Sequence, residues 1–206
     1  MARVLFYFDL TCPYAYLAST QIEALCERAS AELVWRPMLL GGIFRALAAP
    51  QSPGEAMSPP KARMNFLDMH RWADHFGVPL VMPAAHPRRS VGAMRLLVAQ
   101  PPEARARLAH ALFGAYWITG EDIADSTVLL RLAAGAGVEP HAAERALSDP
   151  EVKQALRRDT DDALAHGVFG APSFFVDPPG LLFWGQDRLG FLEKALAGWI
   201  PPGEGA

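Results

Sequence analysis

VLFYFDLTCPYAYL, residues 4–17, is the stretch from which the fold of this chain follows. Its first five residues are apolar and rich in aromatic side chains, which predicts a buried β-strand. An amphipathic helical pattern begins directly after Cys12, and Pro13 occupies the first helical turn, where its missing N–H leaves no hydrogen bond unmade. Cys12 is therefore expected at a helix N-terminus, between a strand and a helix.

The chain continues as a strand-helix-strand unit. Residues 33–35, Leu-Val-Trp, predict a second strand, which the short connection makes parallel to the first with a right-handed crossover. Residues 41–60 are rich in Gly, Pro, Ala and Ser, which predicts a long irregular link. Helical periodicity then predicts helices over 61–76, 89–99, 103–118 and 126–134, and two more within 140–166 that separate near Pro150.

Strand character returns only near the C-terminus. Residues 173–176 and 181–184 flank Asp-Pro-Pro-Gly, which predicts a hairpin, and a final helix opens at residues 186–188. The order β-α-β, helices, β-β-α predicts an α/β fold with a helical insertion between two halves of one sheet. Residues 1–40 and 167–200 then form the α/β domain, 41–166 the link and helical insertion, and 201–206 a loose tail.

Composition narrows the function classes. The chain has 206 residues, of which 51% are hydrophobic and 20% charged, as in ordinary globular proteins. A net charge of -3 argues against a nucleic-acid partner, which needs a concentrated basic surface. Because no apolar run approaches the roughly 18 residues that span a bilayer, and the N-terminus lacks the features of a signal peptide, we expect a cytoplasmic protein without a membrane partner.

Cys12 is the candidate catalytic residue. The unpaired N–H groups and the dipole at a helix N-terminus favour an anion, so we expect a lowered thiol pKa. Position 15 is alanine, so the C-x-x-C redox motif is absent and a dithiol cycle has no second thiol. Cys26 lies on the apolar side of the same helix and is expected in the core. His70 and His75 lack the i, i+4 spacing of a two-histidine metal site, and no metal site is predicted.

Three further positions each admit two interpretations. Pro172 either starts an edge strand as an ordinary trans proline or, in cis, turns the Ala171 backbone toward a ligand. Gln186 and Asp187 either simply cap the last helix or also bind an α-amino and α-carboxylate group. Lys61, at the start of a predicted helix, is either solvated or paired with a carboxylate.

Several motifs together resemble a known family. In chain order they are FYFD (6–9) with PYAYL (13–17), RWA (71–73) with GVPLVMP (77–83), VFGAP (168–172) and WGQDRL (184–189). They look like the 2-hydroxychromene-2-carboxylate isomerases and are similar also to the sister group, the kappa-class glutathione transferases. The resemblance spans nearly the whole chain. It implies a thioredoxin-like domain with a helical insertion, as in the DsbA-like group, usually a homodimer, with glutathione as cofactor.

The resemblance also implies site residues. The family's cis proline falls on Pro172, and the backbone of Ala171 would pair with the peptide backbone of glutathione. The family's acidic residue falls on Asp187, and with Gln186 it would hold the γ-glutamyl end. The family's lysine at the start of the insertion helix falls on Lys61, as a partner for a glutathione carboxylate.

One position departs from the family pattern. The family's usual catalytic residue is a serine, whose hydroxyl hydrogen-bonds the glutathione sulfur, and here the residue is Cys12. A thiol is a weaker donor, so the helix N-terminus must contribute more to stabilising the sulfur. Alternatively, Cys12 forms a mixed disulfide with glutathione. Tyr14, two residues on, is a candidate for lining the substrate pocket.

The resemblance implies a glutathione-dependent isomerase that interconverts 2-hydroxychromene-2-carboxylate and trans-o-hydroxybenzylidenepyruvate in aromatic-compound degradation. The substrate is then a small aromatic oxo-acid, and covalent addition of the glutathione thiolate replaces one difficult double-bond rotation with easier steps. The alternatives are a kappa-like glutathione transferase, a monothiol thiol-disulfide oxidoreductase that uses Cys12, and a non-catalytic binding protein. The fold alone does not separate them.

Overall fold

The sheet forms the centre of the molecule. The computed structural model describes residues 1–52, 54 and 56–203, so the end of the expected tail at 204–206 lies outside the described residues. The strands are β1 (Arg3–Phe8), β2 (Glu32–Pro37), β3 (Ser173–Asp177) and β4 (Leu181–Trp184), in the order β2-β1-β3-β4. β2 runs parallel to β1, whereas β3 is antiparallel to both β1 and β4. The expected strands and the parallel first pair are confirmed.

The other long elements of the described chain are helices. They are α1 (Pro13–Arg28), α2 (Leu40–Ala46), α3 (Pro59–Phe76), α4 (Val91–Val98), α5 (Pro102–Trp117), α6 (Ser126–Gly135), α7 (Pro140–Ser148), α8 (Pro150–Ala165) and α9 (Leu189–Leu196), with a 3-10 turn at Gln186–Arg188. The predicted order of elements is confirmed. None of the described helices has the length and hydropathy needed to cross a membrane.

The helix ends follow local sequence signals. α3 stops at Gly77, whose φ of +67° lies in the left-handed region that glycine adopts without strain. The Asp125 side chain accepts a hydrogen bond from the Thr127 N–H and caps α6. Pro150 begins α8 in the first-turn position that proline tolerates. The predicted end of a helix at residue 76 and the predicted break near Pro150 are confirmed.

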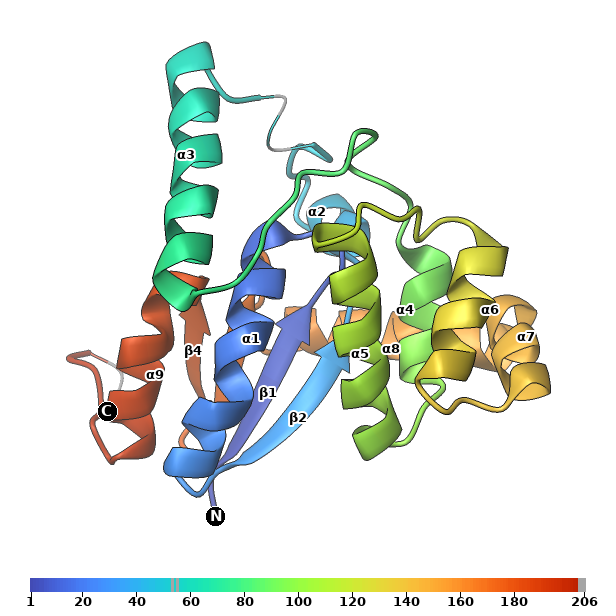
Figure 1. Ribbon diagram of the computed structural model, residues 1–206. Coiled ribbons are helices and arrows are strands. Elements are labelled where there is room, and N and C mark those ends of the chain that lie inside the picture. The colour runs from blue at the N-terminus through green and yellow to red at the C-terminus, as the bar shows by residue number, and fades with distance from the viewer. Residues whose placement is uncertain (53, 55, 204–206) are drawn as a thin grey trace.

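The two faces of the sheet carry different layers. Alternate residues of β1 point to opposite faces, so Phe6 and Phe8 pack on the face covered by α1, where Phe6 stacks on Phe174 with ring centroids 5.3 Å apart. Leu5 and Tyr7 lie on the other face, in a smaller cluster with Ile43 of α2 and residues of α8. In Figure 1, α1 lies in front of β1 and β2, and α8 lies behind them.

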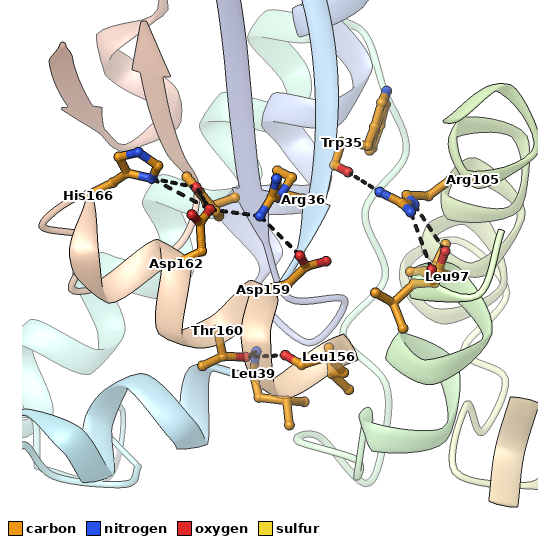
Figure 2. Close-up of polar contacts among 12 residues, drawn as sticks. Trp35, Arg36, Leu39, Leu97, Arg105, Leu156, Asp159, Thr160, Asp162 and His166 are labelled. Carbon is orange, nitrogen blue, oxygen red and sulfur yellow. Dashed lines mark hydrogen bonds and ion pairs between the residues drawn. The ribbon is translucent and has the colours of Figure 1, made fainter. Parts of the chain in front are cut away.

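Charged residues attach α8 to the back of the sheet (Figure 2). Arg36 of β2 forms ion pairs with Asp159, at 3.0 Å, and Asp162, at 2.7 Å, both on α8. The Tyr7 hydroxyl donates to Asp162 at 2.5 Å and lies 2.8 Å from His166 Nδ1. The back face therefore joins α8 through a polar network at its edge as well as through apolar contacts.

Helix α2 corrects one sequence prediction. Residues 41–60 were expected to be irregular, because their glycines and prolines disfavour a helix, and this was wrong over α2. Two external acceptors satisfy N–H groups at the start of the helix: the Leu39 N–H donates to Thr160 Oγ1, and the Leu40 N–H donates to Asp9 Oδ2, each at 3.1 Å. Tertiary contacts that the local pattern does not contain thus stabilise the helix.

Candidate active site

The first turn of α1 is built on Cys12. Its backbone is extended (φ -90°, ψ 116°), as at a helix N-cap, and its N–H donates to the Asp9 carbonyl at 3.0 Å. Its carbonyl accepts from the N–H groups of Ala15 and Tyr16, each at 3.1 Å, and Pro13 takes the first helical position. The predicted position of Cys12, between strand and helix, is confirmed.

The Cys12 thiol contacts the segment before β3. Its Sγ donates to the Ala171 carbonyl oxygen at 3.1 Å, across 159 positions of sequence. The Ala171–Pro172 peptide bond is cis, as the resemblance implied, and the interpretation of an ordinary trans proline was wrong. The Ala171 N–H donates no hydrogen bond to any described residue. Cys12 and the cis proline thus form one site, with a backbone donor at its edge.

The electrostatics of Cys12 overturn the expected lowered pKa. Cys12 is 8% exposed, and burial raises the pKa of its thiol to about 12. The N–H groups of Ala15 and Tyr14 lower this pKa, and the charge of Asp9 raises it. The N–H groups at the start of α1 act in the expected direction, but the loss of hydration outweighs them. Cys12 is therefore a protonated thiol that donates a hydrogen bond.

The turn between β4 and α9 adjoins the cis proline. The Gly185 N–H donates to the Pro172 carbonyl oxygen at 3.0 Å, and Gly185 has a φ of +107°, which a residue with a side chain rarely adopts. Gln186 is buried, while Asp187 is exposed and pairs with Arg188 at 2.5 Å. No side chain caps the 3-10 turn or α9, so the capping that both interpretations included was wrong, and ligand binding by Gln186 and Asp187 stays a prediction.

Tyr14 connects this site to α3. Its hydroxyl donates to Asn65 Oδ1 at 2.9 Å. Burial, with smaller contributions from Asp68, Cys12 and Asp187, raises the pKa of Tyr14 to about 12. Tyr14 therefore lies among groups from α1, α3 and the β4–α9 turn, and its role in lining a substrate pocket stays a prediction. Asn65 was not predicted, because no motif distinguishes it on α3.

Lys61 lies one helical turn before Asn65. Residues four apart on a helix share a face, so the exposed Lys61 side chain starts from the face of α3 that meets Tyr14. No carboxylate among the described residues forms an ion pair with it. Lys61 therefore shares the face of α3 with Asn65, and its pairing with a ligand carboxylate stays a prediction.

Comparison with known proteins gives the family. The sequence model of the DsbA-like thioredoxin domain family matches residues 3–197 of this chain. This chain belongs to the DsbA-like thioredoxin family. It is 31% identical to the 2-hydroxychromene-2-carboxylate isomerase of Sphingobium xenophagum, over 93% of this chain and 96% of that protein. It is also 31% identical to glutathione S-transferase kappa 1 of Rattus norvegicus, over 95% of this chain and 93% of that protein.

Solved structures agree. A structure of 2-hydroxychromene-2-carboxylate isomerase superposes with a TM-score of 0.81 at 26% identity, covering 95% of this chain and 94% of the other. The α/β thioredoxin-like fold and the resemblance to these isomerases and kappa-class transferases are thus confirmed. The curated relatives are enzymes, which supports an enzyme within this family.

Proposed function

We propose that the protein is a glutathione-dependent isomerase that interconverts 2-hydroxychromene-2-carboxylate and trans-o-hydroxybenzylidenepyruvate. The observation that carries the proposal is the hydrogen bond from the buried Cys12 thiol to the Ala171 carbonyl oxygen, beside the cis proline. A nucleophilic cysteine needs a thiolate, whereas a raised pKa keeps Cys12 protonated. A protonated thiol is a donor, which is the role the serine has in the family this chain resembles.

The residues present fit a glutathione molecule. The Ala171 N–H, which donates to no described residue, would pair with the peptide backbone of glutathione. The exposed carboxylate of Asp187, beside Gln186, would hold the γ-glutamyl end, and Lys61 would approach a carboxylate. These groups come from three segments: the residues before β3, the turn after β4 and the start of α3.

When bound, glutathione supplies a sulfur nucleophile for reversible addition to the conjugated framework of the substrate. In the proposed reaction the Cys12 S–H turns from the Ala171 oxygen to the ligand's sulfur and donates a hydrogen bond there. That exchange releases the Ala171 oxygen to accept from the ligand's backbone. The N–H groups of Tyr14 and Ala15, which already lower the pKa of Cys12, add positive potential at the same place. Tyr14 borders the aromatic oxo-acid.

Two substitutions at one position test this role. Cys12→Ser replaces the thiol by a stronger donor, so we expect isomerase activity to be kept or raised. Cys12→Ala removes the donor, and kcat should fall about 10- to 100-fold, since a hydrogen bond to a charged group is worth about 1.5–3 kcal/mol. The measurement is the glutathione-dependent absorbance change with the chromene substrate. A wild-type protein that gives no such change would sink the proposal.

A kappa-like transferase is the second candidate, because a kappa-class relative is as similar as the isomerase relative. A transferase consumes one glutathione per turnover, whereas an isomerase returns it. Titrating free thiol before and after the reaction separates the two. A monothiol oxidoreductase instead predicts a Cys12-glutathione mixed disulfide in mass spectrometry and loss of activity in Cys12→Ser.

The proposal includes a cytoplasmic homodimer. Multi-angle light scattering should give about twice the 22.4 kDa chain mass, and a monomeric mass would contradict the dimer. Localisation is tested by fractionating the cells that make the protein.

A further inference from the structure

Asp9 is the buried carboxylate of this site. It follows β1 directly, lies three residues before Cys12 and is 3% exposed. Its Oδ1 accepts from the Thr11 N–H at 3.1 Å and from the Thr11 hydroxyl at 3.0 Å, and its Oδ2 accepts from the Leu40 N–H at 3.1 Å. These partners are all donors. Burial raises the pKa of Asp9 above its ordinary value, and the hydrogen bonds from Thr11 and Leu40 oppose this, because an ionised carboxylate only accepts hydrogen bonds.

The hydrogen bonds of Asp9 join segments that the sequence separates. Through Thr11 and its own carbonyl, which accepts from the Cys12 N–H, Asp9 holds the turn that carries the thiol. Through Leu40 it holds the start of α2, where an anion is stabilised by the helix dipole. The side chain of Ser90, which precedes α4, faces the same carboxylate. Asp9 thus fixes α2 and the Cys12 turn to each other.

Thr160 is an uncharged side chain that, like Asp9, accepts a hydrogen bond from the start of α2. Its hydroxyl accepts from the Leu39 N–H at 3.1 Å and donates to the Leu156 carbonyl within α8 (Figure 2). The start of α2 therefore has two anchors on neighbouring N–H groups, Thr160 without charge and Asp9 with charge. Removing either one loosens α2, but only removing Asp9 changes the electric field near Cys12.

Other titratable groups surround Asp9 and Cys12. Tyr14 of α1 faces Cys12, and the charges of Asp68 on α3 and of Asp187 after β4 act on Tyr14. Tyr116 of α5 faces Asp9. Among these, Asp9 is the group whose charge raises the pKa of the Cys12 thiol, in addition to burial.

We propose that Asp9 is a positioning residue that ties α2 to the Cys12 turn and holds a carboxylate within that turn, where its charge acts on the thiol. That a thiol donor at Cys12 serves the reaction rests on the proposed function. The hydrogen bonds that join α2 to the Cys12 turn, and the effect of the Asp9 charge on the thiol, do not, because both are properties of the protein alone.

The test measures the rate of Cys12 alkylation by iodoacetamide between pH 7 and 11, with the modified cysteine identified by peptide mass spectrometry. Asp9→Asn removes the charge and keeps the size of the side chain. We expect the Cys12 profile to move to lower pH by about one unit, which is about a tenfold faster alkylation at fixed pH. Thr160→Val, which removes the other anchor without changing charge, should leave the profile at the wild-type pH.

Two outcomes would overturn the proposal: an Asp9→Asn profile that coincides with wild type, or an equal shift in Thr160→Val, which would assign the effect to loosening of α2. If Asp9→Asn does not fold, Asp9→Ser is a second neutral variant with the same expected shift. The assay contains neither glutathione nor the chromene substrate. The alkylation result can therefore be interpreted even if the protein has no isomerase activity. Likewise, the isomerase assay can be interpreted even if Asp9→Asn does not change the alkylation profile.

Discussion

Tyr14 and Tyr16 lie two positions apart on α1, and each donates one phenolic hydrogen bond to a distant segment. Tyr14 donates to Asn65 Oδ1 at 2.9 Å, beside the Cys12 site, and Tyr16 donates to the Pro79 carbonyl oxygen at 2.7 Å, away from it. They lose the same chemical group on substitution by phenylalanine. The pair therefore separates the general cost of a lost hydrogen bond from an effect on the site.

We expect Tyr14→Phe to raise the KM for glutathione several-fold, because the hydrogen bond it removes holds the α3 face that carries Lys61 next to α1. Tyr14→Phe and Tyr16→Phe should each lower the free energy of unfolding by about 1 kcal/mol. Isomerase kinetics at varied glutathione and urea denaturation provide the two readouts. An equal rise in KM in Tyr16→Phe would show that the effect is general loosening of α1.

Local sequence patterns predicted those elements whose causes are local. The apolar run of β1, Pro13 at the start of α1 and Gly77 at the end of α3 each act within a few residues. The predicted strand, the helix start after Cys12 and the helix end at residue 76 were confirmed. α2 was missed because its stabilising partners, Asp9 and Thr160, lie far away in sequence. A local pattern contains no information about such partners.

The features of the candidate site also divide into those that follow from local sequence and those that depend on the whole fold. Cys12 was found from its place before a helix, but its contact with Ala171 spans 159 positions and was not predicted. The family resemblance indicated only the cis bond before Pro172. The direction of the Cys12 pKa was wrong because burial depends on the whole fold, whereas the helix N-terminus is visible locally. Asn65 gave no signal at all.

Helix α8 gives a test at its N-terminus. Asp149 accepts from the Glu151 N–H at 2.7 Å and caps the helix. Asp149→Ala should lower the free energy of unfolding by about 1 kcal/mol, the usual cost of losing an N-cap. Asp161→Ala is the control, because the contact of Asp161 among the described residues is an exposed ion pair with Arg157, and we expect no measurable change. Urea denaturation measures the free energy of unfolding of both variants. Similar losses of stability in the two would contradict the capping role.

The molecule as a whole is held by two different kinds of contact on the two faces of its sheet. Stacked aromatic rings fill the face under α1, whereas the back face joins α8 partly through Arg36 and its two carboxylates. The Nε of Arg36 is buried without a hydrogen-bond partner among the described residues. Stability of the back face should therefore depend on charge, and so on pH, more than stability of the front face does.

Arg36→Met makes this dependence measurable. It leaves Asp159 and Asp162 without their cation, and we expect a loss of about 2–4 kcal/mol near pH 8, at the lower end for broken buried pairs because the groups are partly exposed. Arg3→Met is the control, since the Arg3–Asp177 pair at 2.5 Å is exposed and should contribute nothing measurable. Urea denaturation at a series of pH values gives both quantities.

The loss in Arg36→Met should shrink as the pH falls. Burial raises the pKa of Asp159, and Arg36 opposes this, so the pKa of Asp159 rises further when Arg36 is removed. A carboxyl whose folded pKa lies above its unfolded value destabilises the folded state when it is ionised, and protonation relieves that cost. The difference from wild type is therefore expected to be largest at pH 8 and smaller at pH 5. A difference that is constant, or that grows toward pH 5, would show that Arg36 contributes through its packing and not through its charge.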